Sequence, residues 1–580
     1  MTLTPAPWLG SVLVAASVFP VCAVSADEDY ISDETVLIKS GDAAQISAFV
    51  VRPRDETRKL PAALQFTIYA DRSALKRAQQ AAARGYVGVV GFTRGKWASP
   101  NSVVPYEYDG EDARAVIDWI SRQPWSDGRV GMYGGSYNGF TQWAAAKHLP
   151  HALKTIVPYC PVDPGFGLPM NNNVFLMANY GWVFYATNNK QLDNETYSNT
   201  KRWQELPWNW YRSGRSYREV DQVDGTPNPW LQKWLKHPAY DSYWQGMTTN
   251  GSDYEKLDIP VLAIDGYYDD GQNNAVRRLR DHYRYRPQAE HYLVIGPYDH
   301  FGTQQSTKPG VLRGYSIDPV AQLDTPDLTF DWFDYVLKGA KKPQLLQDKI
   351  NYEVMGANVW RHAPSVEKMS ESVLTLYLDS EKDGDFYRLA RSKPATRGSL
   401  KRLVDYSDRN TVSAKDYPAE IVTGDLGLAQ GLAFVSEPFD RPVSVNGLFT
   451  ATLKATINKK DLDLAVVLYE AMPDGKYFHL SYTVQRASYA ADMTHRELLT
   501  PGRVETIRLA NTLLVSRQLS KGSRLLVVVD VSRGPFAQVN YGTGKDVSDE
   551  SIADAREPLS IEWFNDSHID IPISQSSPMK

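Results

Sequence analysis

The chain reads Gly131-Met132-Tyr133-Gly134-Gly135-Ser136-Tyr137-Asn138-Gly139 where a short apolar strand gives way to a predicted helix. A serine on such a sharp turn needs small neighbours, because the strained backbone brings the residues before and after it close together. Gly134 and Gly139 supply them, although Asn138 stands where the strict Gly-x-Ser-x-Gly pattern has its second glycine. A phosphate-binding loop is disfavoured because no lysine follows at the required spacing. The turn therefore predicts that Ser136 is a nucleophile.

Strands and helices alternate on both sides of this turn. Short apolar runs indicate buried strands, and the segments between them have apolar residues at helical spacing. Such alternation predicts a parallel sheet with helices on both faces. The expected strands are Ala62–Ile68, Tyr86–Phe92, Arg129–Tyr133, Ile156–Pro158, Ile259–Ile264 and Tyr292–Ile295, and the expected helices are Arg72–Arg84, Asp109–Arg122 and Phe140–His148.

A nucleophilic serine needs a base, and in the α/β-hydrolase fold this is a histidine near the end of the sheet sequence. His300 lies just beyond the strand that begins at Tyr292. By contrast, His282 falls in a charged helix and His291 precedes its strand, so we expect both to be solvated. The sequence therefore predicts His300 as the base.

Three aspartates follow the preceding strand and compete for the role of the acid, namely Asp265, Asp269 and Asp270. The acid must reach the imidazole from the loop beyond the strand, which favours Asp269 over Asp265. The other candidates would then cap turns. The predicted order of serine, aspartate and histidine is the one that α/β-hydrolases use.

The composition and residue pattern of the chain change twice outside the predicted α/β region. Seven tryptophans gather between Gly165 and Gly251, which indicates an inserted helical cap or pocket wall. From about Gln344 onward, short β-branched segments and turn pairs such as Asp474-Gly475 predict an all-β sandwich. The expected divisions are a signal peptide (1–26), a first catalytic part (27–164), a helical cap (165–253), a second catalytic part (254–343) and a C-terminal β domain (344–580).

Three segments resemble the catalytic signatures of the cocaine esterase and X-Pro dipeptidyl-peptidase family of serine hydrolases. They are Gly134-Gly135-Ser136-Tyr137, Gly266-Tyr267-Tyr268-Asp269 and Gly296-Pro297-Tyr298-Asp299-His300. The resemblance covers nearly the whole mature chain. It implies an α/β-hydrolase fold with an inserted helical cap, followed by an all-β jelly-roll domain. It also implies that Ser136 is the nucleophile, Asp269 the acid and His300 the base.

The same resemblance implies an oxyanion hole. The family uses the backbone N–H after the nucleophile and a tyrosine hydroxyl from an early loop, which correspond to Tyr137 and Tyr69 here. A preorganised phenol stabilises a developing oxyanion as a backbone donor does. Where the family usually has Pro-Tyr, this chain has Ile68-Tyr69.

Family members cleave esters, acyl amides or X-Pro peptide bonds, so the substrate expected is a small ester or amide or a short peptide. Amino-acid ester hydrolases of the family carry acidic residues two and three positions after the catalytic aspartate, where this chain has Gly271 and Gln272. An α-amino acyl substrate is therefore disfavoured, although Asp270 is a possible partner for an ammonium group. We favour an esterase or acylase, with an X-Pro dipeptidyl-peptidase as the alternative. A binding protein with a decayed triad is a second alternative, which the presence of all three triad residues disfavours.

The N-terminal segment predicts export. The apolar run from Trp8 to Val21 is too short to span a bilayer, and Val24-Ser25-Ala26 offers small residues for cleavage after Ala26. A buried N-terminal helix is disfavoured by the prolines of this segment, and lipidation at Cys22 by the residues before it. Cleavage would leave Cys160 as the single cysteine, so we expect no intrachain disulfide.

Composition excludes several classes of protein. The chain has 580 residues, with 63 Lys and Arg against 68 Asp and Glu, giving a net charge of −5. This balance gives no long-range attraction to nucleic acid or anionic lipid. No second apolar run approaches a membrane span, and the loop from Asp265 to Asp270 lacks the pattern of a calcium site. We therefore expect neither a metal nor a cofactor.

Overall fold

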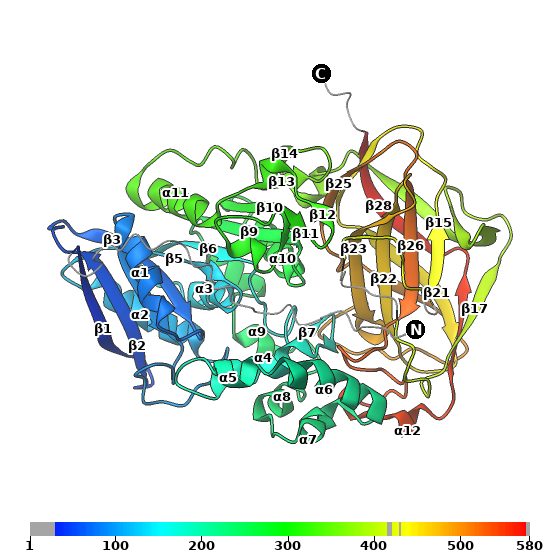
Figure 1. Cartoon of the computed structure of the whole chain (residues 1–580), viewed down its shortest axis with the longest axis horizontal. Coiled ribbons are helices and arrows are strands. Elements are labelled where there is room, and N and C mark those ends of the chain that lie inside the picture. The colour runs from blue at the N-terminus through cyan, green and yellow to red at the C-terminus, as the bar shows by residue number, and fades with distance from the viewer. Residues whose placement is uncertain (1–28, 414–419, 429–430, 576–580) are drawn as a thin grey trace.

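The computed structural model describes residues 29–413, 420–428 and 431–575. Figure 1 shows an α/β domain, a group of helices beneath it and a β domain at the opposite side. The predicted signal peptide lies outside the described residues. No helix among the residues described is long and apolar enough to cross a membrane.

The α/β domain is built on one ten-stranded sheet of order β1-β2-β4-β3-β5-β6-β9-β10-β13-β14. Its central strands, from β4 to β13, are parallel, so their carboxyl ends meet at one edge. The strands are β1 (Tyr30–Lys39), β2 (Gln45–Pro53), β3 (Leu60–Thr67), β4 (Val87–Phe92), β5 (Ser126–Gly135), β6 (Leu153–Tyr159), β9 (Val261–Tyr268), β10 (His291–Asp299), β13 (Ile350–Val354) and β14 (Val359–Ala363).

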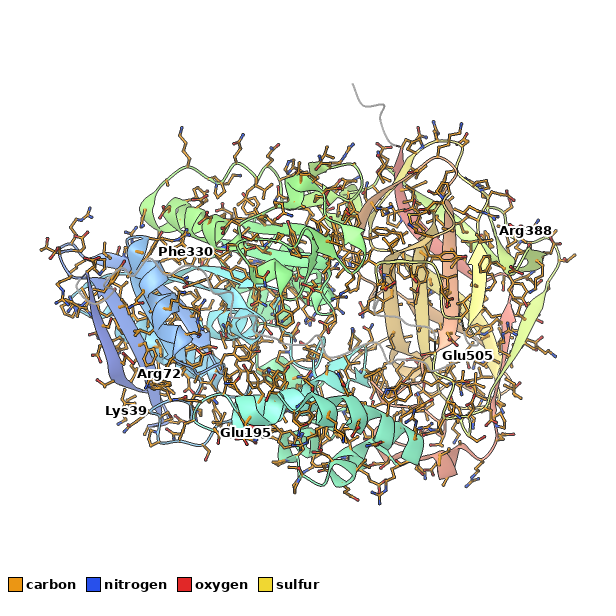
Figure 2. The ribbon with its side chains drawn as sticks, viewed as in Figure 1. Lys39, Arg72, Glu195, Phe330, Arg388 and Glu505 are labelled. Atoms are coloured by element: carbon orange, nitrogen blue, oxygen red, sulfur yellow. The ribbon has the colours of Figure 1, made fainter. Side chains whose placement is uncertain are left out.

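Helices cover both faces of this sheet, as the alternating pattern predicts. On one face α1 and α11 pack on residues such as Val157 and Ile264, and on the other α2, α3 and α10 pack on residues such as Ile156 and Leu293. Phe330 of α11, labelled in Figure 2, lies 5.6 Å from Tyr86 between ring centroids. The helices are α1 (Ser73–Ala83), α2 (Asp109–Ser121), α3 (Tyr137–Lys147), α10 (Gln272–Tyr285) and α11 (Thr325–Lys338).

The cap lies between β6 and β9 and is mostly helical. Its core is aromatic, because the tryptophans that mark this region in the sequence are buried together, among them Trp203, Trp210, Trp234 and Trp244. Its elements are β7 (Met170–Asn171), β8 (Val174–Phe175), α4 (Ala178–Thr187), α5 (Asn194–Tyr197), α6 (Thr200–Ser213), α7 (Val220–Asp224), α8 (Pro229–Trp234) and α9 (Ser242–Gly246).

The C-terminal domain is a 14-stranded sheet in which β16 and β19 pair in parallel and the other pairs are antiparallel. Asp474-Gly475 forms the turn between β22 and β23, as predicted. The strands are β15 (Ser372–Asp383), β16 (Phe386–Ala390), β17 (Ser399–Val404), β18 (Val422–Thr423), β19 (Leu432–Val435), β20 (Val443–Gly447), β21 (Thr450–Ile457), β22 (Asp463–Ala471), β23 (Tyr477–Arg486), β24 (Val504–Leu509), β25 (Val515–Leu519), β26 (Arg524–Val531), β27 (Leu559–Phe564) and β28 (His568–Gln575).

The predicted fold class is confirmed: an α/β-hydrolase fold with a helical cap, followed by an all-β domain. Beyond residue 344, where the β domain is expected to begin, β13 and β14 pair with the sheet of the α/β domain. β13 pairs in parallel with β10, and Leu293 stands opposite Ile350.

The expectation that His282 and His291 are solvated is wrong. Both side chains are fully buried, and their Nδ1 atoms lie 3.2 Å apart. The Nε2 atom of His282 lies 3.0 Å from the carbonyl oxygen of Leu257, which can only accept, so Nε2 carries the proton. If His282 is neutral, its Nδ1 accepts from the Nδ1–H of His291. Burial lowers the pKa of each histidine.

Because of this buried histidine pair, we expect the free energy of unfolding to decrease at acidic pH. Unfolded histidine, with a pKa of about 6.5, takes up a proton that the folded pair resists, so the free energy of unfolding falls as the pH drops through that value. The double variant His282→Gln/His291→Gln is expected to show a smaller decrease in its urea midpoint between about pH 7.5 and 5.5. The exposed His151, changed to glutamine, is the control and should keep the wild-type pH dependence. An unchanged pH dependence in the double variant would contradict this account.

Candidate active site

Ser136 lies on the turn between β5 and α3, with φ 61° and ψ −123°. A non-glycine residue in this region of backbone space is strained, and such strain clusters at functional sites. The glycines on either side make the turn possible. A Cβ atom on Gly134 would lie 2.8 Å from the Cβ of Asn138, and one on Gly139 would lie 2.8 Å from the Cα of Pro161. The close approach predicted from the sequence is therefore present.

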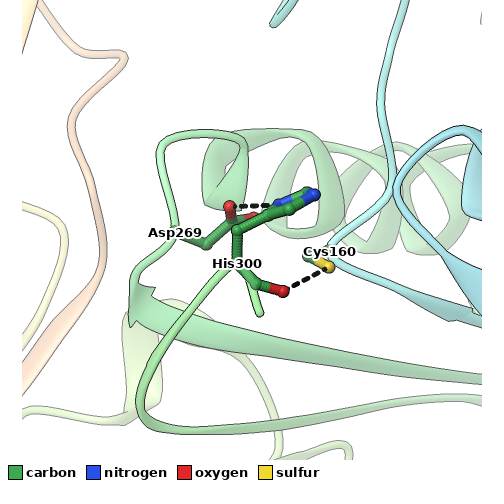
Figure 3. A group of neighbouring side chains, drawn as sticks. All are labelled: Cys160, Asp269 and His300. Carbon is green, nitrogen blue, oxygen red and sulfur yellow. Dashed lines mark hydrogen bonds and ion pairs between the residues drawn. The ribbon is translucent and has the colours of Figure 1, made fainter. Parts of the chain in front are cut away.

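His300 and Asp269 form a hydrogen-bonded pair at the carboxyl ends of β10 and β9. His300 Nδ1 lies 2.8 Å from Asp269 Oδ1 (Figure 3). The carboxylate is fully buried, whereas the imidazole side chain is 26% exposed. A buried acid that holds a partly accessible imidazole through Nδ1 leaves Nε2 to face a substrate.

The loop that carries His300 lies beside the serine turn. Gln304 donates to the backbone carbonyl of His300 at 2.9 Å, and a Cβ atom on Gly135 would lie 2.2 Å from the Gln304 side-chain oxygen. Among the described residues, no hydrogen bond joins Ser136 Oγ to His300. Catalytic hydrogen bonds are often loose before substrate binds and tighten in the complex.

Two further carboxyls, those of Asp265 and Asp270, interact electrostatically with Asp269. Burial and the charge of Asp269 raise the pKa of Asp265 well above the ordinary value, which favours the neutral form of this carboxyl. The same two causes raise the pKa of Asp270 to about 6. Burial also opposes ionisation of Asp269, but the charge and hydrogen bond of His300 lower its pKa below the ordinary value. Of these three carboxyls, Asp269 is therefore the one that ionises most readily.

The imidazole responds to the same charge. Burial alone would lower the pKa of His300, but the neighbouring Cys160 together with the charge and hydrogen bond of Asp269 raises it above the ordinary value. A histidine that gains basicity from a buried aspartate is suited to accept a proton from a serine hydroxyl.

Cys160 stands behind the pair, and its Sγ lies 3.5 Å from the backbone oxygen of His300. Ligand atoms of Cys160, Asp269 and His300 lie within 4.8 Å of one another. Burial raises the pKa of the Cys160 thiol to about 12, so the thiol keeps its proton at neutral pH. Its proton also makes this thiol a poor nucleophile.

Tyr69 reaches the serine from the loop after β3. Its hydroxyl lies 3.4 Å from Ser136 Oγ and accepts a hydrogen bond from Trp182 Nε1 at 3.3 Å. Trp182 belongs to α4 of the cap, and its individual role is not apparent from the sequence, where it is one of many aromatic residues. No spacing rule distinguishes it from the buried tryptophans around it.

Tyr137 contributes to the turn in two ways. As the first residue of α3, its backbone N–H lies in the first turn, where the helix itself offers no acceptor. Its side chain is fully buried below the turn and donates to Asp109 at 2.6 Å. The hydroxyl also accepts from the backbone of Tyr106 at 2.8 Å. The side chain therefore supports the turn that carries Ser136.

Two family models match the chain. The model for X-Pro dipeptidyl-peptidase (S15 family) matches residues 42–302, which include Ser136, Asp269 and His300. The model for the X-Pro dipeptidyl-peptidase C-terminal non-catalytic domain matches residues 346–558. The chain belongs to the X-Pro dipeptidyl-peptidase (S15) family. It is a serine hydrolase of this family.

Known members of the group differ in what they are named for. Cocaine esterase from Rhodococcus sp. (strain MB1 Bresler) is 25% identical over 571 residues, which cover 91% of this chain and 95% of that protein. An aminopeptidase from the marine sediment archaeon Thaumarchaeota archaeon superposes with a TM-score of 0.74 at 19% identity, over 97% of this chain and 99% of that one. An α-amino acid ester hydrolase gives a TM-score of 0.74 at 20% identity, over 97% and 100%. At these identities, the structural likeness shows the fold.

Proposed function

We propose that this S15-family enzyme is an exported esterase or acylase in which Ser136, His300 and Asp269 form the catalytic triad. The observation that carries the proposal is the 2.8 Å contact between His300 Nδ1 and Asp269 Oδ1, next to a serine with positive φ. Ser136 Oγ attacks the carbonyl carbon and His300 Nε2 takes its proton. The imidazolium then protonates the leaving group, and water releases the acid from the acyl-enzyme by the same steps.

The developing oxyanion is stabilised by two donors in this proposal, the backbone N–H of Tyr137 and the hydroxyl of Tyr69. Both lie next to Ser136, one as its chain neighbour and one at 3.4 Å from Oγ. Donors that are in place before the reaction need no reorganisation when negative charge appears, which is why they lower the barrier.

The hydrogen bonds of Gln272 favour an acyl group without an α-ammonium. Gln272 is fully buried, and its side chain exchanges hydrogen bonds of 2.8 and 2.7 Å with the backbone of Leu514 in the β domain. It is therefore committed to the domain junction. Asp270, the other candidate for an ammonium partner, has a pKa raised to about 6 by burial and by the charge of Asp269, so it is mostly ionised at neutral pH and remains a possible partner.

Parallel assays of short p-nitrophenyl esters and an X-Pro p-nitroanilide test the substrate class. We expect the esters to be cleaved with the higher kcat/KM. The match to the X-Pro dipeptidyl-peptidase model favours the peptidase as the second candidate. Preference for the X-Pro anilide would replace the esterase by that alternative. Export rests on the apolar run at 8–21 and the small residues before Asp27.

Removing the hydroxyl of Tyr69 is expected to slow the chemical step. Tyr69→Phe keeps the ring but loses one oxyanion donor, so kcat should fall by about 10²-fold with a smaller effect on KM. If Tyr69 only packs beneath the loop, phenylalanine would be nearly neutral for both constants. Steady-state kinetics on one activated ester distinguish the two, with circular dichroism as the control for folding. A kcat within about threefold of wild type, or about 0.65 kcal/mol, would reject the role.

A further inference from the structure

Two successive polar contacts connect Trp182 of the cap to the proposed nucleophile, Ser136. Trp182 Nε1 lies 3.3 Å from the Tyr69 hydroxyl, which lies 3.4 Å from Ser136 Oγ. An indole nitrogen can only donate, so the Tyr69 oxygen is the acceptor in the first contact. The phenolic hydrogen is then left for an acceptor on the side of the serine. Hydrogen-bond donation therefore runs from Trp182 of the cap through the Tyr69 hydroxyl towards Ser136.

The indole ring of Trp182 is held in place by aromatic neighbours. It stacks on Tyr106 at 5.8 Å between centroids with an interplanar angle of 24°, and lies 5.8 Å from the ring of Tyr137. Tyr137 is itself fixed by its 2.6 Å hydrogen bond to the buried Asp109. Because the ring plane is fixed by packing on both rings, the direction of the N–H is fixed as well.

The helix that carries Trp182 is anchored to the catalytic domain. Lys96, which is fully buried in the loop after β4, donates to backbone carbonyls at and beyond the end of α4. These are the carbonyls of Ala186 at 2.9 Å, Asn189 at 2.7 Å and Gln191 at 3.0 Å. Trp97 returns a backbone hydrogen bond to Lys190 at 2.8 Å. Helix α4 is thus held in a fixed position relative to the catalytic domain and its Tyr69 loop.

We propose that Trp182 is a positioning residue that aims the Tyr69 hydroxyl at the oxyanion, a role that rests on the proposed function of Ser136 and Tyr69. The indole N–H occupies a lone pair of the phenol, which restricts the rotation of its O–H. Accepting this hydrogen bond also polarises the O–H and strengthens it as a donor. The cap therefore completes the oxyanion hole as well as covering the site.

Trp182→Phe tests this role because it removes the N–H but keeps an aromatic ring. On an activated ester, kcat is expected to fall by about fivefold to tenfold, with KM within about threefold of wild type. The same change made in Tyr69→Phe should have no further effect on kcat, because the hydroxyl through which it acts is gone. A packing role alone would not give this dependence on Tyr69.

Trp203→Phe is the matched control within the cap. Its ring packs on the same helix, 3.2 Å from where a Cβ atom on Gly181 would lie, but its N–H donates to Thr196 at 3.0 Å. This variant should keep kcat within about threefold. An unchanged kcat in Trp182→Phe, or an equal loss with and without the Tyr69 hydroxyl, would overturn the proposal. The triad is tested separately, since Ser136→Ala must abolish turnover whatever Trp182 does.

Discussion

Ser136→Ala is expected to lower kcat for short p-nitrophenyl esters by about 10³-fold or more, because the hydroxyl is the attacking group. The fold should be unaffected, since alanine fits the space of a serine and has the same permitted backbone region. Initial rates at saturating ester, with matched circular dichroism spectra, measure the effect. The rate that remains in this variant measures the acceleration that the oxyanion donors and substrate binding provide without a nucleophile.

Cys160→Ala is the matched control for this experiment. Cys160 is the other side chain beside His300 that could in principle attack a carbonyl, with Sγ 3.5 Å from the His300 backbone oxygen. Its raised pKa, about 12 through burial, keeps it as a thiol. The variant should keep kcat within about tenfold of wild type. Activity that survives Ser136→Ala but is lost in Cys160→Ala would move the nucleophile to the cysteine.

Asp269→Asn is expected to lower kcat by about 10²-fold to 10⁴-fold, because asparagine no longer stabilises the imidazolium and favours the wrong tautomer of His300. Asp265→Asn should cost less than about tenfold, since an amide resembles the neutral carboxyl that the raised pKa of Asp265 favours. Asp270→Asn should also be mild, because no hydrogen bond joins it to His300 among the described residues. A crippling effect of Asp270→Asn with an active Asp269→Asn would reassign the acid.

The pH dependence of kcat/KM is a second test of the Asp269–His300 pair. His300 must be neutral to act as a base, and Asp269 raises its pKa. The acid limb of kcat/KM is therefore expected above about pH 6.5 in the wild type. Removing the carboxylate withdraws the stabilisation of the imidazolium, so the residual activity of Asp269→Asn should have its acid limb at lower pH. A limb that moves to higher pH would contradict the assignment.

Local sequence patterns predict the site to the extent that each residue lies on a regular element. Ser136 is recognisable because its turn needs glycine at positions 134 and 139, and the structure shows both close approaches. Asp269 and His300 follow buried strands, and neighbouring parallel strands bring their carboxyl ends together. Turn chemistry and strand order are thus enough to bring the acid and the base into contact.

Features that depend on tertiary packing could not be predicted in this way. His282 has a charged helical context in the sequence, yet its ring is turned inward to a second histidine on β10. The raised pKa of Asp265 follows from its burial next to another carboxylate, which no spacing reveals. Trp182 gains its contact with Tyr69 only because the cap folds back over the catalytic domain.

Labelling with a fluorophosphonate probe tests the central claim most directly, because the probe forms a stable bond only with a serine that a neighbouring base has activated. Wild-type protein should be labelled, and mass spectrometry should place the adduct on Ser136. Ser136→Ala should not be labelled, and Asp269→Asn should be labelled more slowly than wild type. Labelling of Ser136→Ala at the wild-type rate, or an adduct on another residue, would contradict the assignment of the nucleophile.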